Sequence, residues 1–180
     1  MDKVNTVISQ TENWIRHVVV GLNFCPFASK PLRNNSIYYQ VEEHSDKGSA
    51  LASLMSVCNM MMSDPQKETS FLIFSNAFHA FEAYLDVLDL AEQLLKKEQM
   101  EGIFQIASFH PLYQFAGSEL DDPANYTNRS PYPMFHILRE DSLERILEKY
   151  NNTHQIPENN ITTARQLGLE KLKILLESCF

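Results

Sequence analysis

The sequence predicts an α/β protein with a small, mainly parallel sheet of three or four strands, helices packed on it, an N-terminal helix and a long ordered Pro-rich loop. Two apolar runs of strand length, TSFLIFS from Thr69 and IFQIASF from Ile103, are typical of strands covered on both faces. A long amphipathic stretch separates them. The order strand, helix, strand favours right-handed crossovers and parallel strand directions.

The patterns along the chain divide it into elements. They predict a helix over about 3–20, a strand over 37–42, a helix from Asp46 to Asp64, a strand over 69–75, a helix over about 78–98, a strand over 103–109, an edge strand or short helix over 134–139, a helix from Asp141 to Tyr150, and a final helix from Pro157 to about Ser178.

In the first half, apolar residues recur about every 3.6 positions up to Gly21, a residue suited to leaving a helix. The segment IYYQV of the 37–42 strand is rich in β-branched and aromatic residues. Ser45 and Asp46 can cap the next helix, and the Asp64–Pro65 pair ends it. These signals predict a helix, a strand and a second helix.

In the second half, the helix over 78–98 presents one apolar face and ends in a cationic pair, which complements the helix dipole. Gly102 precedes a strand that is apolar on both sides, so we expect it at the centre of the sheet. Asp141 and Glu144 resemble a capping box, and Pro157 suits the first turn of the final helix.

Composition narrows the class of protein. A chain of 180 residues suits one domain, which we place over 1–180. With 44% hydrophobic and 21% charged residues, and no apolar run near the roughly 20 residues that span a bilayer, we expect a soluble protein with no membrane role. The first residues lack the apolar core of a signal peptide, so we expect a cytoplasmic location.

Charge and cysteine content bear on partners. The formal charge of −8 and the pI near 5.2 argue against nonspecific nucleic-acid binding, which uses clustered Lys and Arg. Three scattered cysteines fit a reducing compartment rather than a disulfide framework. A small molecule is the expected partner, and the sequence leaves the oligomeric state open.

The segment from Gln105 to Glu140 has the composition of a site. It is too aromatic for a flexible linker and too rich in Pro, Asn and Asp for one regular element. A loop of this length without regular structure is usually functional or disordered, and its aromatic residues favour order. It follows a strand, at the carboxyl edge of the predicted sheet, where ligands of open parallel sheets bind.

Two histidines in this region are candidate acid or base groups. His110 comes at the end of a strand and before Pro111, and His136 lies in a mixed apolar stretch. The alternative for His110 is a side chain that hydrogen-bonds its own loop and stiffens it.

The loop also carries carboxylates, amides and a guanidinium. Asp122 could orient a catalytic histidine, although an Asp before Pro commonly caps a turn instead. A set of further residues could hold an anionic ligand or, equally, stabilise the loop itself. These candidate ligand-binding residues are Asn125, Tyr126, Asn128, Arg129 and Arg139.

Cys25 lies in the turn GLNFCPF after the first helix. It could act as a nucleophile if a histidine such as His110 came beside it. The alternative is a buried structural thiol, which is common for free cysteine. No CxxC, HxH or HExxH spacing supports a metal site, and no GxGxxG, GxxxxGK[ST] or GxSxG motif indicates a cofactor, so the cofactor stays open.

The stretches GLNFCPFA, SFHPLYQFAG, DDPANYTNRSPYP with HILRE, and NNITTARQLG together resemble domain-of-unknown-function family 1415, which is found mostly in bacteria. The resemblance covers almost the whole chain. It implies that these motifs belong together, with matching residues at Cys25, His110, Asp122, Asn125, Arg129, His136 and Arg139. It brings no assigned reaction.

Two functions remain from the sequence. The first is an enzyme that acts on a small polar or anionic metabolite, with His110 as acid or base and Arg129 holding the anion. The alternative is a non-catalytic module that binds a small anion or a peptide in a rigid pocket. The first predicts that Cys25 or Asp122 lies within hydrogen-bond reach of His110, and the second that Arg129, Arg139 and Asn125 converge.

Overall fold

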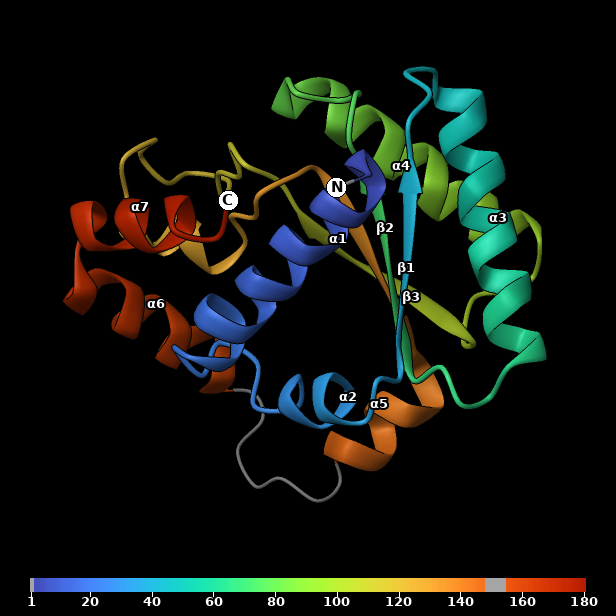
Figure 1. Ribbon diagram of the computed structural model, residues 1–180, viewed down its shortest axis with the longest axis horizontal. Helices are drawn as coiled ribbons and strands as arrows, with labels where there is room; N and C mark the ends of the chain where they lie inside the picture. Colours follow the sequence, from blue (N-terminus) through green and yellow to red (C-terminus); the bar gives the residue numbers. More distant parts are fainter. Residues whose placement is uncertain (1, 148–154) are drawn as a thin grey trace.

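The computed structural model describes residues 2–147 and 155–180. Its centre is a sheet of four strands in the order β1-β2-β4-β3. The strands are β1 (Ile37–Glu42), β2 (Thr69–Phe74), β3 (Phe104–Phe109) and β4 (Met134–Arg139). Helices lie on both faces of this sheet (Figure 1), and the α/β class is therefore confirmed.

The sheet is mixed rather than mainly parallel. β1 and β2 pair in parallel, whereas β4 is antiparallel to both β2 and β3. β3 therefore runs in the same direction as β2, as the crossover argument predicts, but it does not pair with it. Instead β4 fills the place between them.

The expected positions of two strands are corrected by this order. β4 was expected at an edge and is internal, and β3 was expected at the centre and is an edge strand. The physical reason is burial, because Met134, Phe135 and Ile137 of β4 are all fully buried. The β3 side chains after Phe104 are only partly buried or exposed. The apolar run of β3 therefore predicted a strand but neither full burial of its side chains nor pairing on both of its edges.

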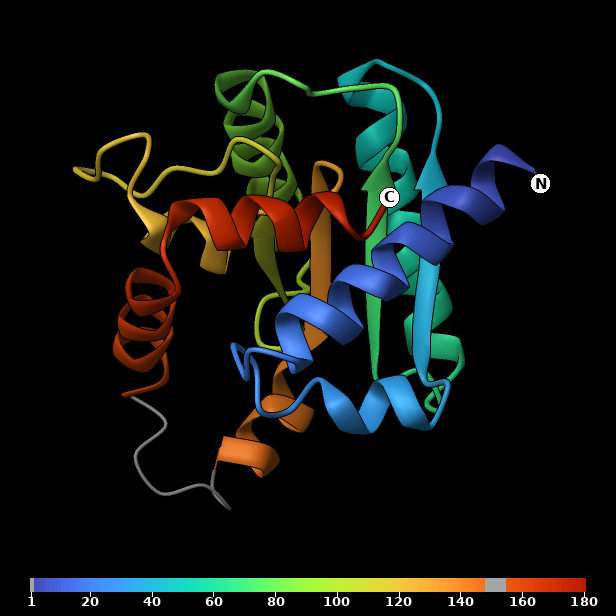
Figure 2. The same cartoon turned by 60° about the vertical axis from the view of Figure 1, so that its left-hand side comes forward.

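The two faces of the sheet have separate cores. Helices α3 (Lys47–Ser63) and α4 (Phe81–Lys97) cover one face, with Leu54, Leu72 and Phe135 in the core between. Helix α1 (Lys3–Trp14) crosses the other face, as Figure 2 shows.

The core under α1 joins distant parts of the chain. It contains Trp14, Phe71 and Leu172, the last from helix α7 (Leu169–Glu177). A short helix, α2 (Ser29–Arg33), leads from α1 back to the sheet. The first and last segments of the chain therefore pack on the same face.

Several helices match their sequence signals. Asp46 caps α3 by accepting a hydrogen bond from the backbone amide of Ser49 at 2.8 Å. The predicted N-terminal helix over 3–20 is present, but its last six residues, Ile15–Val20, form a π-helix (η1) with wider turns.

The C-terminal third differs in two places. The expected final helix is broken at Gly168, whose φ of 81° ends α6 (Ile156–Leu167) before α7 begins. Helix α5 (Glu140–Leu147) follows β4, and the predicted continuation to Tyr150 lies outside the described residues. Across the described part of the chain, no helix combines the length and apolar character that crossing a bilayer requires.

Candidate functional site

The loop between β3 and β4 is ordered by its own polar groups. His110 is buried, and both nitrogens of its ring are engaged by backbone: Nε2 lies 2.8 Å from the carbonyl oxygen of Phe78, and Nδ1 lies 2.9 Å from the amide of Leu112. Since the amide can only donate and the carbonyl can only accept, the ring is neutral with its proton on Nε2. Burial lowers the pKa of His110, which keeps it neutral.

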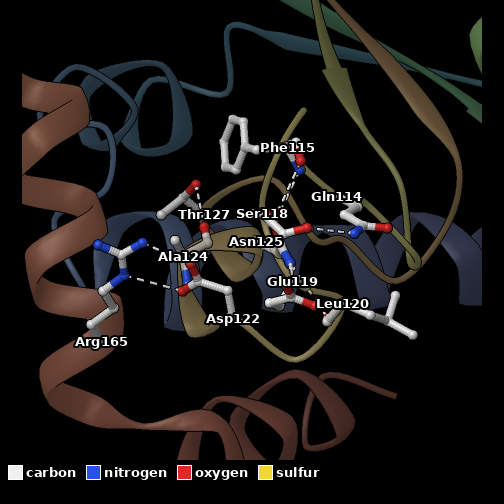
Figure 3. A network of polar contacts seen from close by, with 10 residues as sticks. All are labelled: Gln114, Phe115, Ser118, Glu119, Leu120, Asp122, Ala124, Asn125, Thr127 and Arg165. Carbon is white, nitrogen blue, oxygen red and sulfur yellow. Dashed lines mark hydrogen bonds and ion pairs between the residues drawn. The ribbon is translucent and has the colours of Figure 1, made fainter.

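Asn125 is the centre of this loop. It is fully buried, and its Oδ1 accepts hydrogen bonds from the amide of Phe115 at 3.0 Å and from the hydroxyl of Ser118 at 2.8 Å. Its Nδ2 donates to the carbonyl oxygen of Glu119 at 2.9 Å (Figure 3). The Asn125 side chain thus supplies the hydrogen bonds that hold this irregular loop together. Both its oxygen and its nitrogen are used for this, so neither is available to a ligand.

Asp122 has a capping role and an ionic one. Its Oδ1 accepts the amide of Ala124 at 2.9 Å at the start of the 3₁₀ helix η2 (Pro123–Thr127). Its two oxygens also accept hydrogen bonds from Arg165 of α6 at 3.1 and 2.7 Å (Figure 3). The Arg165 guanidinium lowers the pKa of this carboxyl. Asp122 therefore joins the loop to α6 and does not contact either candidate histidine.

Arg129 and Asn128 also serve the loop backbone. The guanidinium of Arg129 donates to the carbonyl oxygens of Tyr113 and Leu120 at 3.2 and 2.9 Å, and it lies 4.6 Å from the centre of the Tyr126 ring. The side chain of Asn128 donates to the carbonyl oxygen of Ser108 at 3.1 Å. This geometry favours the alternative in which the residues stabilise the loop.

Arg139 lies at the far end of β4, away from this loop. Its guanidinium donates to the carbonyl oxygens of Lys67, at 3.1 Å, and of Met61. Arg139 therefore does not converge with Arg129 and Asn125.

The two candidate histidines lie on opposite faces of the sheet. His110 packs against Phe81 and Tyr84 of α4, with ring centroids 5.2 and 5.0 Å apart. His136 packs against Phe71, with centroids 4.2 Å apart, under α1. They cannot act on one ligand.

A cavity of about 210 Å³ lies between the sheet and the elements that follow α1. Its wall comes from the end of α1, η1, the turn after it, α2, all four strands and the start of α5, and it is almost entirely apolar. The lining includes Trp14, Ile15, Val19, Cys25, Phe27, Ala28, Pro31, Ile37, Glu68, Thr69, Phe71, Ala107, Phe109, His136, Leu138, Arg139, Ser142 and Leu143. Three residues proposed from the sequence for different reasons, Cys25, His136 and Arg139, thus line one cavity.

The position of this cavity differs from the expected one. Thr69 and Ile37 begin their strands, and Leu138 is near the end of the antiparallel strand β4. The cavity therefore lies toward the amino ends of the parallel pair, whereas the sequence argument placed the site at the carboxyl ends.

His136 is held by a neighbouring hydroxyl. Its Nε2 lies 2.7 Å from Oγ1 of Thr69, and that hydroxyl is also 2.8 Å from the carbonyl oxygen of Ile137. The imidazole stacks on Phe71 with 6° between the planes. Desolvation by the surrounding apolar groups lowers the pKa of His136 to about 3, so the ring is neutral near pH 7.

Cys25 is brought to the cavity by the wide turns of η1. The amide of Phe24 donates to the carbonyl oxygen of Val19 at 2.9 Å, five residues back, and the amide of Cys25 reaches the same oxygen at 3.4 Å. Burial raises the pKa of the Cys25 thiol, and the backbone amides of Phe27 and Ala28 offset part of the rise. The sulfur is therefore a neutral thiol near pH 7.

The other polar groups on the cavity wall already have partners. The indole Nε1 of Trp14 donates to the carbonyl oxygen of Arg129 at 3.0 Å. The Glu68 carboxylate accepts hydrogen bonds from Lys30 at 3.0 Å and Ser36 at 2.9 Å. Burial raises the pKa of Glu68, but these two donors outweigh it and the pKa is lower than usual.

Sequence reasoning missed Thr69 and Trp14, which shape the surroundings of His136. One signal was present, since His136 is the imidazole in the middle of an apolar strand, where a polar side chain needs a partner on the next strand. The identity of that partner depends on the β2–β4 register, which the sequence does not give. No cluster of three or more potential metal ligands occurs within 2–147 and 155–180.

The fold and site define the chain as a mixed α/β protein with an apolar cavity that is lined by a thiol and an imidazole. The chain belongs to the family described as "Protein of unknown function (DUF1415)", whose sequence profile matches residues 6–174. Neither the curated proteins nor the solved structures that were compared with it gave a match.

Proposed function

We propose that this protein is an enzyme that acts on a small, largely apolar molecule bound in the cavity, with the unprotonated His136 as its base group and Cys25 as a second reactive group. The observation that carries this proposal is that both side chains line the same apolar cavity. The groups expected to bind an anion are engaged with backbone instead. The ligand we propose is therefore neutral and apolar rather than anionic.

The volume limits the size of the ligand. An apolar cavity of about 150 Å³ holds benzene, and this one measures about 210 Å³. A molecule of one or two fused rings, or an aliphatic compound of similar bulk, matches this space. Such a molecule would contact the rings of Trp14, Phe71 and Phe109.

Binding is tested by thermal unfolding with a panel of small apolar compounds. A ligand present at about 100 times its Kd stabilises a protein by about 2.7 kcal/mol, which raises the Tm of a chain this size by about 5–10 °C. The matched control is Ala107→Leu, which adds carbon atoms at a position on the cavity wall next to His136 in the β3–β4 pairing.

We expect Ala107→Leu to lose the ligand-induced rise in Tm because its side chain occupies the ligand's space. An equal rise in both proteins would place the ligand elsewhere. No rise with any compound would refute the proposal.

Turnover is tested separately, by mass spectrometry of each binding compound after incubation with the protein. We expect a changed compound with the wild type and none with His136→Phe, and a loss with Cys25→Ala if the thiol takes part. Binding without any change would favour the alternative, a non-catalytic small-molecule binding protein, since the same cavity serves either function.

A further inference from the structure

We infer that the cavity selects ligands that carry an O–H or N–H donor, because His136 presents an unprotonated Nδ1 to it. This inference deepens the proposed function and rests on it. It names the chemical class of the ligand: a compact apolar compound, such as a phenol or an indole, with one hydrogen-bond donor.

The first step is the position of the imidazole proton. Thr69 has one hydroxyl hydrogen, and the carbonyl oxygen of Ile137, at 2.8 Å, can only accept it. The same hydroxyl oxygen must then accept from Nε2 of His136 at 2.7 Å. The neutral ring therefore carries its proton on Nε2, and Nδ1 has a free lone pair.

The second step is that Nδ1 is unused and reachable. Within the described residues, the hydrogen bond of the His136 side chain is the one that Nε2 makes with Thr69. Nδ1 is not among the side-chain atoms that are sealed from solvent without a partner, which are the hydroxyls of Tyr39 and Ser70. The ring lines the cavity, so this is where Nδ1 can meet a donor.

The third step is that the direction of this lone pair is fixed. The His136 ring stacks on Phe71 at 4.2 Å, and Phe71 in turn stacks on Tyr39 with centroids 6.1 Å apart. Three rings thus lie side by side across three strands, and the Thr69 hydrogen bond sets the rotation of the last one. Because the acceptor is already fixed in place, a ligand whose donor points at it binds without the entropic cost of ordering the imidazole.

The polar side chains of Trp14, Thr69 and Glu68 already have protein partners, whereas no hydrogen bond to Nδ1 of His136 is found among the described residues. Trp14 and Thr69 are engaged with backbone oxygens, and the Glu68 carboxylate holds Lys30 and Ser36. The low pKa of His136 keeps Nδ1 unprotonated at neutral pH, which supports the same assignment.

The experiment uses two pairs of probes with nearly equal shape: indole with indene, and phenol with toluene. The member with a donor should bind the wild type about tenfold more tightly in at least one pair, as expected for one hydrogen bond to a group that is otherwise unpaired. Dissociation constants are measured by calorimetry near pH 7.

Two variants and one control assign the preference to the imidazole. His136→Phe should bring the ratio of the two constants close to one, since a phenyl ring can stack on Phe71 but cannot accept. Thr69→Val retains the imidazole but removes the hydroxyl that holds its proton on Nε2. The proton can then lie on either nitrogen, so the ratio should fall only in part. His79→Phe, at an exposed histidine, should keep the wild-type ratio.

The possible failures are distinct. If both members of each pair bind the wild type equally well, the inference is wrong while the proposed binding function stands. If His136→Phe keeps the full preference, the donor meets another group and the inference is also wrong. If none of the four probes binds while another compound of the panel raises the Tm, the inference is wrong and the proposed binding stands. If no compound raises the Tm, both fail.

Discussion

At the residue scale, the structure separates two histidines that the sequence treats alike. His110 uses both ring nitrogens on backbone groups, whereas among the described residues the His136 side chain makes its hydrogen bond through Nε2 alone, and the ring lines a cavity. The difference cannot be found from local sequence, since each histidine lies in or directly after an apolar run. It depends on which strand or helix packs against each ring.

The depressed pKa of His136 predicts a pH dependence of stability. Its pKa is about 3 in the folded state against 6.5 for an ordinary histidine. Between these values the unfolded chain binds a proton that the folded one does not, so the free energy of unfolding falls as pH decreases from about 6.5. The full slope for one such group is about 1.4 kcal/mol per pH unit. We expect a smaller slope because the His136 side chain is only partly buried and lines the cavity.

This dependence is measured by urea unfolding between pH 7.5 and 5. His136→Phe should lose less stability than the wild type over that range, and the difference between the two isolates one imidazole. His110, also with a lowered pKa, and His44, whose pKa is raised by Glu42, contribute equally to both proteins. Parallel curves would show that His136 is not held neutral.

Asn125 provides a second prediction at this scale. Asn125→Ala removes the acceptor of the Phe115 amide and the donor to the Glu119 carbonyl. Buried polar groups without partners cost about 1–3 kcal/mol each, so we expect a loss of about 2–4 kcal/mol in the free energy of unfolding. The control is Asn59→Ala on an exposed position of α3, which should change stability by less than about 0.5 kcal/mol. Equal effects would mean that the loop is not held by this amide.

At the element scale, the π-helix η1 decides where the Cys25 turn lies. The π-helical hydrogen bonds continue to Gly21, whose amide donates to the carbonyl oxygen of Arg16, five residues earlier, at 3.1 Å. A Cβ atom on Gly21 would lie 2.2 Å from the carbonyl oxygen of His17. Since φ at Gly21 is −62°, the requirement is for space and not for a left-handed conformation.

The sign of the stability change in Gly21→Ala can therefore be predicted. In an ordinary helical conformation alanine stabilises a protein by about 0.5–1 kcal/mol relative to glycine. Here we expect a loss of about 1–3 kcal/mol, because the backbone must shift to admit the methyl group. Urea unfolding measures it, with Gly48→Ala in the first turn of α3 as the control, where the nearest contact is a side-chain oxygen at 3.1 Å. Stabilisation at Gly21 would contradict the π-helical geometry.

Most elements could be predicted from local patterns. The hydrophobic period and caps gave α1, α3 and α4, and continuous apolar runs gave β2 and β3. The π-helical turns could not be predicted, since Ile15–Val20 has the same apolar period as the helix before it. Helix α2 was also missed, because all of its residues are at least partly exposed and it carries no apolar stripe.

At the scale of the whole molecule, the arrangement of the strands could be predicted only in part. Local sequence gives the direction of β1, β2 and β3 through their helical connections, but not the place of β4, which arrives through a long irregular loop. This strand brings His136 beside Thr69 and Phe71. The cavity is therefore a product of the pairing order, and its contents could not be assembled from motifs along the chain.

The same arrangement places the protein's single tryptophan on the cavity wall. Trp14 is almost fully buried, with its ring against Phe71 and Phe109. Its ultraviolet emission therefore comes from this one location, with no second indole to obscure it. Intrinsic fluorescence can thus serve as a label-free optical readout of occupancy by ligands that do not themselves emit in the ultraviolet, such as toluene-sized aliphatic compounds.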